Sequence, residues 1–125
     1  RADAALPGYV DNPWAWMARA SVFALSSRWE GLPGVLIEAM ACGCPVVSTD
    51  CPSGPAEILE GGVHGPLVPP GDAGALAEAI LKLLDAPPNP VWLRARAAGF
   101  SVEPAVDRYL EVLLGGAKRD RCDFA

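Results

Sequence analysis

The chain has 125 residues, of which 51% are hydrophobic and 20% charged, and its formal net charge is −5. This length suits one modest domain with one core, and the lack of an uninterrupted Lys or Arg run excludes a nucleic-acid groove or an anionic membrane surface as an expected partner. No segment has the roughly 18 consecutive apolar residues that a membrane span needs. A signal peptide ahead of Arg1 stays open, because the sequence does not begin with Met.

The first quarter of the chain predicts an extended segment, a helix and a strand. Residues 6–10 are expected to be extended, and a helix should follow, because Asn12 can cap it and Pro13 suits its first position. The spacing of Trp14 from later apolar residues puts it on the buried face of that helix. Residues 21–26 form an apolar run without polar alternation, which is typical of a strand buried on both faces of a parallel sheet.

The middle of the chain repeats this order. Pro33 begins a second predicted helix, which runs to about Cys42 and stops at Gly43. Residues 44–49 are predicted to form the next buried strand. Residues 51–59 are predicted to form a loop that leads into a short helix.

The last part of the chain is predicted to be mainly helical. After a brief extended piece at 65–70, Asp72 caps a helix over 73–85; a shorter helix is expected at 91–98, and Ser101 caps the last one. The inward face of the helix over 73–85 is expected to carry Leu76, Ile80, Leu83 and Leu84. The last helix has a stripe, suited to a core or an interface, of Val106, Tyr109, Leu110 and Leu113.

The alternation of strands and helices predicts an α/β fold with a parallel sheet. Only two or three strands are clear, whereas a doubly wound domain has about five or six. We therefore expect a partial Rossmann-like sheet with flanking helices over residues 1–114, the later part of such a domain. Residues 115–125 are expected to be a flexible tail.

The chemistry concentrates between residues 27 and 38. A loop leaves the predicted strand at 21–26 and meets a helix start, where free backbone N–H groups and the helix dipole favour a phosphate. Glu30 repels phosphate, so hydroxyl groups are its expected partners, and Glu38 needs hydrogen bonds because its neighbours are apolar. A nucleotide-sugar has hydroxyl groups at both ends, on the ribose and on the sugar, and phosphates between them. A solvated Glu30 and a Glu38 paired with an Arg or a backbone amide remain the structural alternative.

The segment SSRWEGLPGVLIEAMACGCPVVSTDCPSGPAEIL, followed by GPLVPPGD, resembles the C-terminal half of retaining glycosyltransferases of the family-4 type, which have the GT-B fold. The likeness covers roughly residues 8 to 114 and is far longer than a short motif. The family pattern is E-G-(x)6-E-A-M-A-x-G-x-P-V-V. It is matched by Glu30, Gly31, Glu38, Ala39, Met40, Ala41, Gly43, Pro45, Val46 and Val47.

The resemblance implies transfer of a hexosyl group from a nucleotide-diphospho-sugar donor with retention of configuration and without a metal or other cofactor. The residue that matches Glu30 contacts the donor sugar's hydroxyls and is the implied catalytic residue, and the one that matches Glu38 contacts the ribose. Backbone amides at the loop and helix start bind the sugar and diphosphate. The implied donor-binding residues are Gly31, Leu32, Pro33, Gly34, Val35 and Glu38.

The sequence departs from the family in several ways. Family members place an acceptor-binding domain, an earlier strand, a Gly-rich turn and an Arg/Lys pair before this region, and none of these precedes Arg1 here. Arg19 and Arg28 do not match that pair, and Leu32 stands where the family often has Phe. We therefore expect the 125 residues alone not to transfer sugar. A non-catalytic nucleotide-binding module and a truncated, non-functional fragment are the alternatives.

Several other residues have two interpretations. Asp50 lies nineteen residues after Gly31, as in dinucleotide folds, but GLPG is not G-x-G-x-x-G, so capping of the following loop is favoured. Ser53, Gly54 and Glu57 match a family loop near the donor, while Glu57 also suits the first turn of a short helix.

His64 is expected to be a solvated turn residue, and Trp29 either lines the sugar pocket or packs against the helix. The cysteines lack C-x-x-C spacing, which favours reduced thiols in a cytoplasmic protein. A second option for its location is peripheral attachment to the inner face of a membrane through the missing domain. A metal site is the weakest alternative. It would use Cys42, Cys44, Cys51 and His64, and the fourth cysteine is Cys122.

Overall fold

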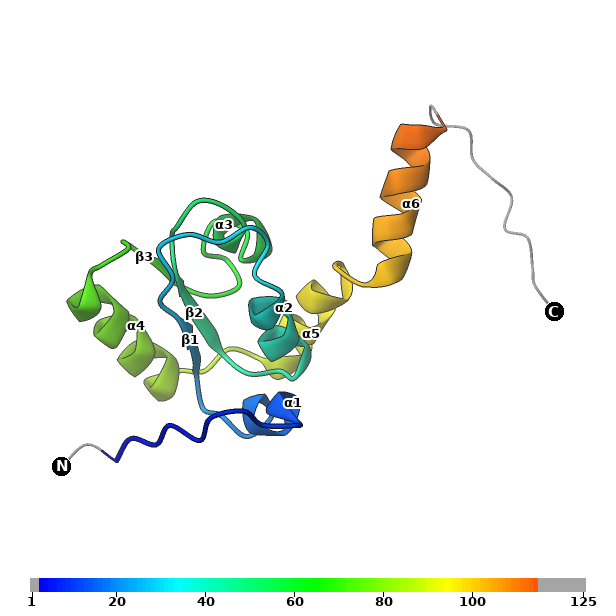
Figure 1. Cartoon of the computed structure of the whole chain (residues 1–125). Helices are drawn as coiled ribbons and strands as arrows, with labels where there is room; N and C mark the ends of the chain where they lie inside the picture. The colour runs from blue at the N-terminus through cyan, green and yellow to red at the C-terminus, as the bar shows by residue number, and fades with distance from the viewer. Residues whose placement is uncertain (1–2, 115–125) are drawn as a thin grey trace.

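The computed structural model describes residues 3–114, so the predicted tail and Cys122 lie outside the described residues. Helices and strands alternate through the first two thirds of this range, and three helices follow (Figure 1). In chain order they are α1 (Pro13–Met17), β1 (Phe23–Leu25), α2 (Gly34–Ala41), β2 (Val46–Thr49), α3 (Pro55–Ile58), β3 (Leu67–Val68), α4 (Ala73–Asp85), α5 (Pro90–Ala98) and α6 (Val102–Leu113).

The three strands form one parallel sheet in the order β1-β2-β3. Phe23 pairs with Val46 on one side of β2, and Ser48 pairs with Leu67 on the other. All four residues of β2 are buried, as expected for the central strand of a covered parallel sheet. The predicted α/β fold is confirmed.

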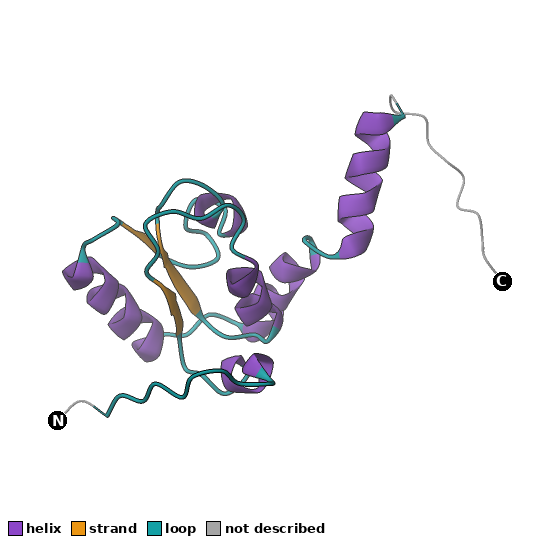
Figure 2. Ribbon diagram, viewed as in Figure 1, coloured by secondary structure: helices purple, strands orange, loops and turns teal. Residues whose placement is uncertain are grey.

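Helices cover both faces of the sheet (Figure 2). Neighbouring residues of a strand point to opposite faces, so Val46 and Val47 belong to different cores. On one face α4 packs against β2 and β3. This smaller core is formed by Val47, Val68, Ala79 and Leu83. On the other face α1, α2, α3 and α5 enclose the larger core, formed by Met17, Leu36, Ala39, Met40, Cys44, Val46, Ile58, Leu59, Leu93 and Ala97.

The expectation that residues 21–26 are buried on both faces is wrong. The strand is only three residues long, Ala24 is exposed, and its neighbours Phe23 and Leu25 are half-buried. In the described sheet β1 is an edge strand, so one of its sides has no strand against it. An apolar run therefore predicted the strand but not its position in the sheet.

Local signals set the helix ends largely as predicted. The side chains of Asn12 and Asp72 accept hydrogen bonds from the backbone N–H groups of Ala15 and Ala75, at 3.1 and 2.9 Å. The second helix begins at Gly34, one residue later than expected, with Pro33 as its N-cap. It ends before Gly43, whose φ of +79° allows the chain to turn away from the helix.

The interior face of α4 differs from the prediction. Leu83 is buried, and Leu76 and Ile80 are partly buried against the smaller core, but Leu84 is 51% exposed. Ala79 takes the buried position instead. Ala79 packs in the smaller core with Val47 of β2, so the buried face of α4 differs from the one that the leucines alone suggest.

Helix α6 extends away from the sheet and its covering helices (Figure 1). It has no buried residue, and Tyr109 and Leu113 of its apolar stripe are 70% and 75% exposed. The expectation that this stripe lies in the core is wrong, and an interface role stays a prediction. Ser101 is the N-cap, but its side chain makes no capping hydrogen bond. None of the helices within residues 3–114 is both long and apolar enough to cross a bilayer.

Candidate functional site

Two loops meet at the carboxyl-terminal edge of the sheet. The first, residues 26–33, leaves β1 and enters α2, and the second, residues 50–54, leaves β2 and enters α3. Because β1 and β2 are parallel neighbours, both loops emerge at the same edge. This is the edge at which α/β sheets bind ligands, and α3 lies beside it in Figure 1.

Hydrogen bonds join the two loops into one unit. The backbone N–H of Glu30 donates to the carbonyl of Pro52 at 3.1 Å, and the N–H of Ser53 donates to the carbonyl of Glu30 at 3.0 Å. Below them, the hydroxyl of Thr49 donates to the carbonyl of Ser27 at 2.5 Å. The backbone around Glu30 is thus held by the neighbouring loop, which fixes the place from which its side chain extends.

Gly54 brings the second loop against the first. Its φ is +87°, and a Cβ atom there would lie 2.2 Å from the carbonyl oxygen of Gly31 and 2.7 Å from Cδ of Pro33. Only glycine tolerates both this conformation and this approach. The sequence suggested Gly54 for its likeness to a family loop, and the structure adds the steric reason for glycine at this position.

The start of α2 exposes unpaired donors. Within residues 3–114, the backbone N–H groups of Gly31, Leu32, Gly34 and Val35 donate no hydrogen bond. A Cβ atom on Gly31 would meet nothing within 4 Å, so the space in front of these groups is open. The N–H groups of Gly34 and Val35 carry the positive end of the helix dipole, and together with those of Gly31 and Leu32 in the preceding loop they can bind an anion.

Glu30 lies half-buried beside this helix start. The Ser27 hydroxyl donates a hydrogen bond of 2.6 Å to its Oε1. This partner is a neutral hydroxyl, so it brings no opposite charge, and the remaining acceptor positions of the carboxylate stay available. The arrangement differs from the alternative of a fully solvated loop residue, and the role of Glu30 toward a sugar stays a prediction.

Glu38 is also half-buried and is one turn further along α2. The indole Nε1 of Trp14 donates to its Oε2 at 3.0 Å, so the expected need for a hydrogen-bond partner is confirmed. The partner is neither the Arg nor the backbone amide of the structural alternative. The expectation that Trp14 lies in the core is wrong, because its side chain is 52% exposed and bridges to this carboxylate.

Two other predictions near this edge, for Asp50 and Trp29, are changed by the structure. The Asp50 side chain makes no hydrogen bond within the described range, so it does not cap the loop after it; only its backbone N–H is bound, to the Val68 carbonyl at 2.7 Å. Trp29 is 76% exposed, which excludes packing against the helix and leaves the pocket interpretation open. Arg19 and Arg28 are exposed and form no ion pair with another described residue.

The expectation that His64 is a solvated turn residue is wrong. The ring is buried, stacks on Trp92 with 4.2 Å between centroids, and shares a 3.2 Å contact between Nε2 and the carboxylate of Glu60. Sequence reasoning missed this contact because Trp92 lies in α5, far along the chain. No group of three or more His, Cys, Asp or Glu side chains among the described residues is arranged to hold a metal ion, so the metal alternative finds no support.

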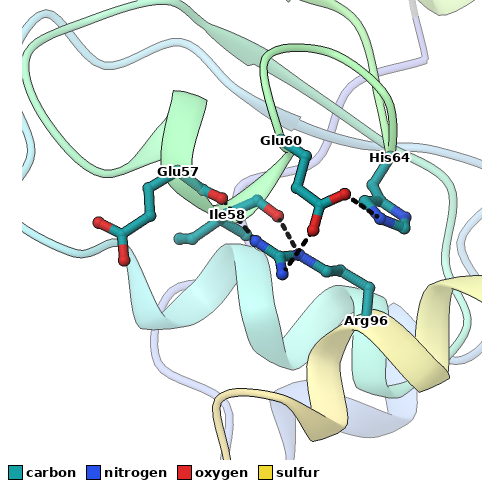
Figure 3. Close-up of polar contacts among 5 residues, drawn as sticks. All are labelled: Glu57, Ile58, Glu60, His64 and Arg96. Carbon is teal, nitrogen blue, oxygen red and sulfur yellow. Dashed lines mark hydrogen bonds and ion pairs between the residues drawn. The ribbon is translucent and has the colours of Figure 1, made fainter.

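The polar contacts drawn in Figure 3 attach α5 to α3 and to Glu60, which follows α3. Arg96 of α5 donates to the carbonyls of Glu57 and Ile58 at 2.6 and 2.9 Å, and pairs with the carboxylate of Glu60 at 2.9 Å. The Glu57 side chain points away from this cluster and is exposed. Because α3 begins next to Gly54, Arg96 holds the far end of the segment that supports the Glu30 loop.

Residues 2–86 match the sequence model of a protein family described as glycosyl transferases group 1. The chain is 36% identical over 81 residues to the lipopolysaccharide 1,6-galactosyltransferase of Escherichia coli, covering 62% of this chain and 23% of that protein. It is 40% identical over 101 residues to D-inositol 3-phosphate glycosyltransferase 1 of Catenulispora acidiphila, covering 78% and 24%. The chain thus spans less than a quarter of the length of these curated relatives.

A solved structure shares the fold. The apo form of the lipopolysaccharide outer core galactosyltransferase WaaB matches with a TM-score of 0.76 and 23% identity, over 87% of this chain and 32% of that one. The fold is therefore that of a GT-B glycosyltransferase over the matched part.

Proposed function

Because the chain belongs to the glycosyl transferases group 1 family, we propose that it binds the nucleotide-diphospho-sugar donor of a sugar transfer that retains the anomeric configuration. The observation that carries this proposal is the helix start of α2. Its unpaired N–H groups are flanked by two carboxylates, Glu30 and Glu38, and each carboxylate is held by one neutral donor. A ligand with phosphates in the middle and hydroxyl groups at both ends complements this arrangement.

Each part of the site has its own role in this proposal. Glu30 accepts hydrogen bonds from the hydroxyls of the donor sugar and acts as the catalytic residue, and Glu38 accepts them from the ribose. The N–H groups of Gly31, Leu32, Gly34 and Val35 bind the sugar and diphosphate, together with the contact surface of Leu32 and Pro33. Their open approach and the two glycines that create it support this assignment.

The reaction breaks the bond between the anomeric carbon and the diphosphate oxygen while the oxygen of the acceptor hydroxyl bonds to that carbon from the same face, and the hydroxyl proton passes to the leaving diphosphate oxygen. Negative charge then develops on the leaving diphosphate. The preorganised N–H groups and the dipole of α2 stabilise that charge without any reorganisation during the reaction. We further propose that residues 1–125 alone bind the donor but do not transfer sugar, because the family resemblance places the acceptor site in a separate domain.

Titration calorimetry with UDP, GDP and ADP tests the donor site. We expect one nucleoside diphosphate to bind, and Glu38→Gln to weaken it at least about tenfold through loss of the charged acceptor. The matched control is Glu78→Gln, because Glu78 is an exposed residue of α4 on another face. The proposal would be contradicted if the cooperatively folded protein bound none of the three nucleotides. It would also be contradicted if Glu38→Gln and Glu78→Gln bound the nucleotide equally well.

A further inference from the structure

Trp14 makes two contacts with α2 that lie one helical turn apart. Its indole Nε1 donates to Oε2 of Glu38 at 3.0 Å, and its backbone carbonyl accepts a contact of 3.7 Å from the thiol of Cys42. The short helix α1 is therefore attached to α2 through this residue. Its indole is 52% exposed, so burial alone does not explain its position.

Among residues 3–114, the contact with Trp14 leaves one oxygen of Glu38 without a hydrogen bond. Oε2 receives the indole N–H, while Oε1 lies 4.0 Å from the position that a Cβ of Gly34 would occupy. Gly34 is the first residue of α2, next to the unpaired N–H groups. The free oxygen is thus on the side of the open helix start, where the proposed nucleotide would lie.

The chemistry of the indole suits this arrangement. An indole N–H donates a hydrogen bond and carries no charge. It therefore fixes the direction of the Glu38 side chain. Unlike a Lys or Arg, it does so without placing a positive charge beside the carboxylate. A glutamate has several rotatable bonds, and holding it in one orientation before the ligand arrives lowers the entropic cost of binding.

We propose that Trp14 is a positioning residue, which holds Glu38 so that its free oxygen faces the ribose hydroxyls of the donor. This inference rests on the proposed function, because it assumes that Glu38 binds ribose. Trp14 itself does not contact the reacting atoms. Its contribution is an orientation of Glu38 that a nucleoside diphosphate can use and that a ligand without ribose cannot.

The decisive experiment compares Trp14→Phe with Trp16→Phe, because both residues are exposed tryptophans of α1 and only Trp14 donates to Glu38. Affinities are measured for the nucleoside diphosphate that binds wild type and for inorganic pyrophosphate. We expect Trp14→Phe to weaken the nucleoside diphosphate about tenfold, to leave pyrophosphate unchanged, and to add nothing in a Glu38→Gln background. Trp16→Phe should change neither ligand.

The outcomes separate this inference from the proposed function. If Glu38→Gln weakens the nucleotide but Trp14→Phe does not, the positioning role is overturned and the donor site stands. Equal weakening of both ligands by Trp14→Phe also overturns it, since that indicates general damage to the helix start. If Glu38→Gln has no effect, the proposed function fails, and this inference fails with it.

A measurement on the unsubstituted protein covers the case in which Trp14→Phe does not fold. The four tryptophans give four indole N–H signals in a proton–nitrogen NMR spectrum. The Trp14 signal should shift with the nucleoside diphosphate and not with pyrophosphate, because only ribose engages Glu38. A Trp14 signal that is insensitive to both ligands would overturn the inference.

Discussion

Replacing Gly54 with alanine tests whether the contact between the two loops supports the site. The new Cβ would lie 2.2 Å from the carbonyl oxygen of Gly31 and 2.7 Å from Cδ of Pro33. Neither neighbour is the flexible end of a side chain, so the backbone of one loop must move. The residue must also keep a φ of +87°, which alanine disfavours.

The cost follows from these two effects. A positive φ costs a residue with a Cβ roughly 1 to 2 kcal/mol, and forcing an extra carbon into packed surroundings costs roughly 1 to 3 kcal/mol. Together they predict a loss of about 2 to 5 kcal/mol from a stability that is typically about 5 to 15 kcal/mol. At about 4 °C per kcal/mol for a chain of this length, the thermal midpoint should fall by about 8 to 20 °C.

Urea unfolding and a thermal scan measure this loss, and calorimetry follows nucleotide affinity in parallel. Gly71→Ala is the matched control, because Gly71 has a φ of +86° but a Cβ there would meet nothing within 4 Å. It should show only the conformational cost. If Gly54→Ala destabilises the protein no more than Gly71→Ala does, the steric argument for the loop contact is refuted.

Three further predictions concern the core, the cluster below α3 and the thiols. Leu93→Ala removes a fully buried side chain and should lower the free energy of unfolding by about 2 to 5 kcal/mol in urea titrations; a loss below 1 kcal/mol would contradict its place in the core. Arg96→Met removes the side-chain donor of two α3 carbonyls, of which only that of Glu57 keeps a second donor, the backbone N–H of Glu60. It should cost about 1 to 3 kcal/mol, measured against Arg94→Met, whose exposed side chain makes one hydrogen bond at 3.2 Å. Burial raises the pKa of the Cys44 thiol, so less thiolate forms at pH 8 and iodoacetamide should label Cys44 more slowly than Cys42 in mass spectra; equal rates would count against this.

Structural features that depend on residues close together in the sequence were predicted correctly. Asn12 and Asp72 begin helices because a side chain can reach a backbone N–H three residues later. Gly43 ends α2 because its positive φ is a local property. The parallel direction of β1, β2 and β3 followed from the alternation of strands and helices.

Contacts between distant segments were not predicted, because nothing in the local pattern reports them. Trp14 was expected in the core from its spacing alone, yet its partner Glu38 is 24 residues away. His64 is buried because Trp92 of α5 covers it. At the candidate site, the motif indicated the glutamates and the helix start, but not the neutral donors that hold the carboxylates.

The hydrogen bonds between the two loops have a consequence for folding. They join residues 22 positions apart, such as Ser27 with Thr49 and Gly31 with Ser53, so the site cannot form from a short stretch of chain. Parallel pairing between β1 and β2 must close first, and such non-local pairing is slow because the entropy of loop closure opposes it. We therefore expect the binding site to form only after β1 and β2 have paired. A nucleotide that binds only the finished site would slow unfolding and add about 2.7 kcal/mol of stability at a hundred times its dissociation constant.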